Sequence, residues 1–261
     1  MSDRRPPFGL LLPAMVGLAF LVLPLIGLLI RAPWGDAGTV LRGSGAGRAL
    51  ALSLITASAA TLLSLLVGVP LAWLLARPGG RYRSVLRAVI TVPLVLPPVV
   101  GGVALFALLG RSGIIGRPMY ALTGFSFPFT PYAVVLAQTF VALPYLVLAV
   151  EGALRAADRR YEDAAQTLGA GPFLVFWRVT LPLIGPGVAS GAVLAWARAL
   201  GEFGATITFA GNFPGTTQTM PLAIYLALQT NTDTATLLSV LLLAVSVAVL
   251  ALLRDRWVRA W

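Results

Sequence analysis

Six apolar stretches, each at least 20 residues long, constrain the fold of this chain more than any other feature. A helix rises about 1.5 Å per residue, so 20 residues already cross the ~30 Å hydrocarbon core of a bilayer. Only 11% of the residues are charged, against roughly 25% in soluble domains. We therefore predict an all-α integral membrane protein, one transmembrane domain over residues 1–261. Its expected spans are approximately residues 8–30, 49–76, 85–109, 132–154, 183–210 and 234–253.

The first apolar stretch follows Arg4 and Arg5, an arrangement that signal peptides share. Its apolar region is about 23 residues long, whereas the apolar region of a signal peptide has about 7–15, and no clear A-x-A site follows it. We predict a retained first span.

Arginines are distributed unevenly between the two sides of the predicted spans. One side carries Arg31, Arg42, Arg48, Arg111 and Arg117, and the side of both termini carries Arg4, Arg5, Arg77, Arg81, Arg83, Arg87, Arg155, Arg159, Arg160, Arg178, Arg254, Arg256 and Arg259. The positive-inside rule then predicts that both termini are cytoplasmic. The net charge of +10 suits anionic lipid headgroups. Basic and aromatic residues do not alternate as nucleic-acid binding would require, so no nucleic-acid partner is expected.

The sequence contains no Cys, no His and no Lys. Without Lys the chain cannot form a P-loop of the form G-x-x-x-x-G-K-[ST]. Without Cys or His it lacks the usual ligands of zinc, iron–sulfur clusters and haem, and the usual nucleophile–base pairs. We expect no enzyme activity of its own, no metal and no cofactor.

The segment between the fourth and fifth spans, called here the 155–182 loop, predicts two short helices. Asp158 can cap the first helix, and Gly169 can end it in the left-handed conformation. Pro172 suits the first position of the second helix, and Leu181-Pro182 closes that helix before the fifth span.

The second of these helices, residues 173–180, is too short to span a membrane and too apolar to stay uncovered, because it begins Phe-Leu-Val-Phe-Trp. It either lies flat on the membrane or is covered by another protein. Small Ala164 and Ala165 in the first helix favour the close approach of another backbone over contact with lipid.

Within this loop, Asp163-Ala164-Ala165-x-x-x-Gly169, nine further residues and Val179-x-Leu181-Pro182 resemble a known signature. It is the E-A-A-x-x-x-G-x9-I-x-L-P loop of bacterial importer permeases in the ATP-binding-cassette superfamily. Two positions depart from it, with Asp163 in place of Glu and Val179 in place of Ile. The resemblance implies a type I importer permease with six transmembrane helices in the bacterial inner membrane. It also implies that this loop docks on a cytosolic ATPase, of which two copies are expected.

The predicted fifth span carries two charges, Arg198 and Glu202, four residues apart and so on one helix face. Charges at membrane depth often mark a pathway, so a role in the path or its gating is expected alongside mere charge neutralisation. Gly201 and Gly204 permit a bend or close helix contact. Glu151 and Arg155 form a similar pair near the end of the fourth span, which we assign to the membrane interface.

The predicted third span contains Pro93, Pro97 and Pro98. Prolines interrupt the backbone hydrogen bonds of a helix, and carbonyl groups freed at membrane depth must face protein or water. We predict that this span lines the path, although prolines are also common in membrane helices without such a role.

Residues 197–225 resemble the molybdate branch of these permeases; sulfate and thiosulfate permeases share the core A-R-A-x-G-E-[FY]-G. The continuation from Gly211 to Pro221 fits the molybdate branch better, and tungstate and sulfate remain alternative substrates. The resemblance implies a homodimer and an extracytoplasmic molybdate-binding protein that delivers the oxyanion.

Three other classes are weaker interpretations of the sequence. An ion-coupled secondary transporter would need unpaired ionisable residues in several spans. An intramembrane enzyme lacks His, Lys and Cys, and no predicted span contains Asp. A structural scaffold leaves the 155–182 loop unexplained.

Overall fold

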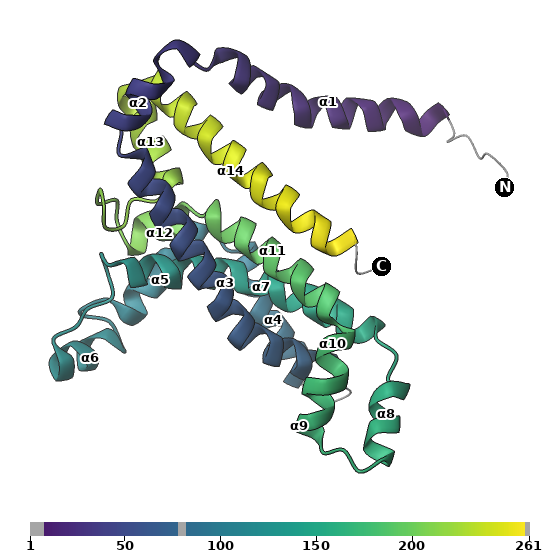
Figure 1. Ribbon diagram of the computed structural model, residues 1–261. Helices are drawn as coiled ribbons and strands as arrows, with labels where there is room; N and C mark the ends of the chain where they lie inside the picture. Colours follow the sequence, from purple (N-terminus) through teal and green to yellow (C-terminus); the bar gives the residue numbers. More distant parts are fainter. Residues whose placement is uncertain (1–7, 78–81, 259–261) are drawn as a thin grey trace.

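In the computed structural model, which describes residues 8–77 and 82–258, the described residues form helices and connecting turns without any strand. Figure 1 shows their arrangement. In chain order they are α1 (Phe8–Arg31), η1 (Trp34–Asp36), α2 (Ala37–Gly43), α3 (Ala46–Ala76), α4 (Tyr82–Val95), α5 (Pro98–Leu109), α6 (Gly116–Thr123), α7 (Pro131–Ala156), α8 (Arg160–Thr167), α9 (Pro172–Val175), η2 (Phe176–Thr180), α10 (Leu181–Leu183), α11 (Gly185–Leu200), α12 (Gly204–Phe209), α13 (Met220–Thr230) and α14 (Thr232–Val258). The predicted all-α class is confirmed.

Four helices, α1, α3, α7 and α14, are long and apolar enough to cross a membrane on their own. Two more candidate spans are bent pairs: α4 with α5, at 115°, and residues 172–183 with α11, at 72°. If each bent pair counts as one span, the described residues contain six, the number predicted.

The third predicted span, residues 85–109, is not one helix but α4 followed by α5. Pro97 precedes α5 with an extended backbone (φ −54°, ψ 132°), and Pro98 is the first residue of that helix. Proline fits there because the first N–H groups of a helix have no partner within it. The predicted interruption is therefore confirmed at Pro97 and Pro98, but it is wrong for Pro93, which lies inside α4.

The fifth predicted span, residues 183–210, is also divided. α11 ends at Leu200, and α12 starts four residues later at Gly204. Closure of the preceding loop helix at Leu181-Pro182 is wrong, because a π-helical turn, η2, continues into α10 as far as Leu183. Helix α13 was not predicted, because its apolar stretch is too short to read as a span.

Helices α3, α7 and α11 pack together through small residues. A Cβ atom on Gly68 of α3 would lie 2.8 Å from Leu146 Cδ2 of α7. Two turns further along α7, a Cβ on Gly187 of α11 would lie 2.3 Å from Ala153 Cβ. Lipid supplies no hydrophobic force between helices, so close packing of this kind is what joins them. By contrast, Figure 1 shows α1 at the edge of the bundle, near α14 only at the end that leads to α2, and the apolar stretch of α1 is 0% buried.

We expect Gly187→Ala to destabilise the bundle by about 1–3 kcal/mol, because the added methyl overpacks the contact with Ala153. Thermal unfolding in detergent should show a Tm lower by several degrees. The control is Gly152→Ala on α7, where a Cβ would meet nothing within 4 Å. Equal Tm values for the two variants would contradict this account of the packing.

Candidate functional site

The 155–182 loop begins with α8, whose two ends follow local rules. Asp158 Oδ1 accepts a hydrogen bond from the Arg160 backbone N–H at 3.0 Å, but the N-cap residue of α8 is Arg159, so the predicted cap lies one residue too early. Gly169 has φ +87°, and the Ala170 N–H bonds to the Ala165 carbonyl at 3.0 Å. The predicted left-handed end at Gly169 is confirmed, and this conformation favours glycine, which has no Cβ.

Glu162, rather than its neighbour Asp163, ties the loop together. Its carboxylate is buried, and Oε1 accepts a hydrogen bond from Thr180 Oγ1 at 2.6 Å. Oε2 forms an ion pair with Arg77 Nη2 at 2.9 Å. One carboxylate therefore joins α8, the second loop helix and the residue that follows α3, three segments distant in sequence. Asp163 is exposed.

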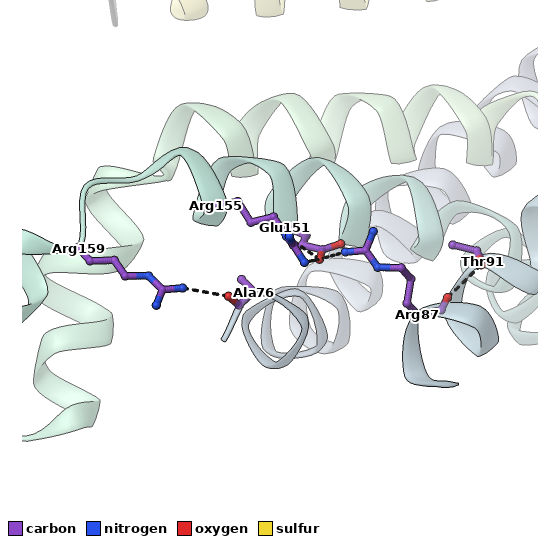
Figure 2. A network of polar contacts seen from close by, with 6 residues as sticks. All are labelled: Ala76, Arg87, Thr91, Glu151, Arg155 and Arg159. Carbon is purple, nitrogen blue, oxygen red and sulfur yellow. Dashed lines mark hydrogen bonds and ion pairs between the residues drawn. The ribbon is translucent and has the colours of Figure 1, made fainter. Parts of the chain in front are cut away.

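The end of α3 is held by two arginines. Arg159 Nη2 donates to the Ala76 carbonyl at 3.1 Å, which satisfies a carbonyl group at the helix terminus (Figure 2). The Arg77 guanidinium lies 4.7 Å from the centre of the Trp73 ring. The loop is thus attached to the bundle through charged contacts at the end of α3.

The outer surface of the loop is apolar and uncovered. Ala164 is exposed and Ala165 is partly buried. Large apolar side chains stand around them, namely Tyr161 (61% exposed), Leu168 (89%), Phe173 (78%), Leu174 (49%) and Trp177 (52%). This group is called here the outer apolar surface.

The second part of the signature lies on the continuous helical path from η2 into α10. Val179 and Leu181 are partly buried, and Pro182 is exposed. Thr180 between them is buried and bonded to Glu162. Thr180, which stands at the variable x position of Val179-x-Leu181-Pro182, therefore makes the buried contact with Glu162.

The predicted pair of Arg198 and Glu202 forms, at the junction of α11 and α12. Arg198 Nη1 lies 2.6 Å from Glu202 Oε2, and the Glu202 residue is only 1% exposed. Glu202 Oε1 also accepts the backbone N–H of Ala205 at 2.8 Å. Gly201 follows the last residue of α11 as its cap. The carboxylate therefore neutralises a charge at the end of one helix and satisfies a donor at the start of the next.

The two interrupted spans meet at α5 and α12. A Cβ on Gly204 would lie 2.9 Å from Pro98 Cβ, and a Cβ on Gly102 would lie 1.7 Å from Thr208 Oγ1. Only glycine permits such close approach of the two backbones. The structure thus brings Pro98 and Gly204 together, whereas Pro93 lies inside α4.

A third buried carboxylate, Glu151, lies near the end of α7 (Figure 2). Arg155 Nη2 pairs with its Oε1 at 2.9 Å, as the four-residue spacing predicted. Arg87 of α4 pairs with the same oxygen. Glu151 is 3% exposed, so its carboxylate is buried between the two helices as well as paired within α7.

Sequence reasoning missed Glu162, Thr180, Arg77 and Arg87. The Arg87–Glu151 and Arg77–Glu162 contacts join residues far apart in the chain, so no local pattern reports them. One usable signal was present: the chain has only nine acidic residues, and a carboxylate in so apolar a protein needs a cationic partner.

The chain matches the family described as "Binding-protein-dependent transport system inner membrane component" over residues 68–260. It is 53% identical over 243 residues to the "Molybdenum transport system permease protein ModB" of Mycobacterium tuberculosis, covering 93% of this chain and 92% of that protein. It is 43% identical over 210 residues to the Escherichia coli K12 protein of the same name, covering 80% and 92%.

Two solved structures share the fold. A chain from a bacterial ABC transporter involved in the import of the acidic polysaccharide alginate superposes with a TM-score of 0.73 at 21% identity, covering 97% of this chain and 94% of that one. A chain from the MetNI methionine ABC transporter in an inward-facing conformation gives 0.61 at 19% identity, covering 91% and 97%.

We expect Glu162→Ala to loosen the 155–182 loop, because it removes both an ion pair and a charged hydrogen bond, together about 2–3 kcal/mol. Hydrogen exchange of the α8 amides should accelerate about 30- to 160-fold. Asp163→Ala, in the same turn but exposed, is the matched control and should change exchange only slightly. Similar exchange in both variants would remove the special role of Glu162.

Proposed function

This chain belongs to the family of binding-protein-dependent transport system inner membrane components, and we propose that it is the permease subunit of an ATP-driven importer for molybdate. It is an integral membrane transport subunit of the type I importer fold. The observation that supports molybdate as the substrate is the sequence identity to molybdenum permeases along most of the chain. Sulfate, thiosulfate and tungstate are the alternative cargoes.

The outer apolar surface supports docking of a cytosolic ATPase on α8 and the second loop helix. Its exposed aromatic and aliphatic side chains, beside small Ala164 and Ala165, suit insertion into a groove of another protein. The seven signature residues are assigned to this coupling role: Asp163, Ala164, Ala165, Gly169, Val179, Leu181 and Pro182. Because this chain contains no Lys, the ATP-binding P-loops belong to the partner.

Both termini are proposed to lie in the cytoplasm of a bacterial cell, on the side of the docking loop. Arg77, Arg87 and Arg155 gather at that end, in keeping with the positive-inside rule.

Two copies of the chain are proposed to enclose the path, with an extracytoplasmic binding protein supplying the oxyanion. The exposed apolar length of α1 offers surface to a second copy as well as to lipid. The contact between α5 and α12 is the proposed gate region, comprising Pro97, Pro98, Gly201 and Gly204, with Pro93 in the arm that leads to it. Arg198 is already paired with Glu202, so we assign this pair to gating rather than to binding of the anion.

The test of this function is ATP hydrolysis by the chain in liposomes, assembled with the ATPase and binding protein encoded beside it. Molybdate, tungstate and sulfate are supplied in turn. Stimulation by molybdate or tungstate, with uptake into the liposomes, is expected because only a loaded binding protein should trigger the cycle. A response to sulfate alone would assign the chain to the sulfate branch. Failure to assemble with the ATPase would contradict the proposal.

We expect Ala164→Glu to abolish co-purification of the ATPase, because a long charged side chain would enter the docking contact without a partner. The matched control is Ala121→Glu, an exposed alanine on α6, which has eight residues like α8. The control should retain the ATPase. Normal co-purification of the Ala164→Glu variant would remove α8 from the interface.

A further inference from the structure

Helix α4 is attached to the bundle by few contacts. Ile90 is its one buried residue among those described. Near its start, Arg87 reaches Glu151 of α7 and forms an ion pair (Figure 2). Thr91 Oγ1 bonds back to the Arg87 carbonyl at 3.0 Å, which is a contact within α4 and adds no attachment to α7. The ion pair is therefore the principal polar anchor of α4.

Glu151 lies between the 155–182 loop and α4, so a displacement of the loop end of α7 can be transmitted to α4. It lies five residues before the end of α7, and the 155–182 loop leaves α7 directly after it. On the other side of the pair, α4 leads through the bend at Pro97 into α5, which packs against α12 at Gly204. Arg155 binds the same Glu151 oxygen but belongs to α7, so it joins no second helix.

We propose that Glu151 is a positioning residue for transport, which holds α4 to the loop-bearing end of α7 through Arg87 so that the bend at Pro97 follows the docking loop. The inference rests on the proposed function, because it assigns a mechanical task to the same gate region. An ion pair suits this task because its carboxylate is buried, with Glu151 3% exposed, while the Arg87 side chain that reaches it is 45% exposed. A pair of this kind holds its partners at short range and in a fixed orientation.

The first experiment measures molybdate uptake per ATP hydrolysed in the reconstituted complex. Arg87→Gln and Glu151→Gln should each lower this ratio about 10-fold or more, a coupling of the size common between linked sites. Both variants should still co-purify with the ATPase, because neither residue belongs to the outer apolar surface. The double variant should be no worse than either single one, since both remove the same pair.

Two comparisons separate positioning from general damage. Arg155→Gln removes the other partner of Glu151 within α7, and its ratio should stay within about twofold of the parent because it breaks no link between helices. Arg87→Lys keeps the charge and should recover part of the loss. Arg87→Gln leaves Glu151 paired with Arg155, so the buried carboxylate keeps a cationic partner. If Glu151→Gln fails to fold, Arg87→Gln therefore still tests the proposal.

The second experiment measures the distance between α4 and α7 directly. The chain contains no Cys, so spin labels can be placed by Val85→Cys and Ala156→Cys, both at exposed positions. With Arg87 present the distance distribution should stay narrow both with and without ATP. In Arg87→Gln it should broaden.

The outcomes are distinguishable. Absence of uptake by the parent complex contradicts the proposed function itself. If the parent complex takes up molybdate, three results would each contradict the role of Glu151 but not the proposed function. They are unchanged coupling in Arg87→Gln, an unchanged distance distribution in that variant, and losses that multiply in the double variant.

Discussion

The lack of water in the bilayer core decides most of this architecture. Every backbone N–H and C=O group within it needs a partner from the protein, so helices are the available element and interruptions must be covered. Within the described residues, the interruption at Pro97 and the interruption at Gly201 to Phe203 lie against each other. α5 packs closely on α12 because Gly102 and Gly204 carry no side chain of their own, and Glu202 satisfies a donor left free where α12 begins.

Charge is sparse here, and carboxylates at three structural joints have arginine partners. Glu202 spans the junction of α11 and α12, Glu162 joins both loop helices to α3, and Glu151 joins α7 to α4. Because each carboxylate is buried, its orientation is fixed, and removing its partner would leave an uncompensated buried charge. Apolar packing, in contrast, makes α3, α7 and α11 a unit through small residues, with no need for charge.

The sequence was sufficient for features that depend on local rules. Apolar length predicted the spans, the left-handed end at Gly169 followed from glycine chemistry, and the four-residue spacing predicted the Arg198–Glu202 pair. It was insufficient wherever tertiary contacts decide. The direction of Glu162 into the loop depends on Arg77 and Thr180, which no helical periodicity connects to it. The extent of the bend after α4 depends on the surface that α5 finds on α12. The signature drew attention to Asp163, but the inward contact belongs to the preceding residue.

The bend between α4 and α5 also sets a scale for motion. α5 has 12 residues, so at about 1.5 Å per residue it is a rod of about 18 Å. Since α5 stands at 115° to α4, twisting α4 about its own axis swings α5 sideways instead of merely spinning it. A twist of about 10° would sweep the far end of α5 by about 3 Å, on the order of the diameter of a water molecule. Rotation at one membrane surface is thereby converted into lateral displacement deep within the protein.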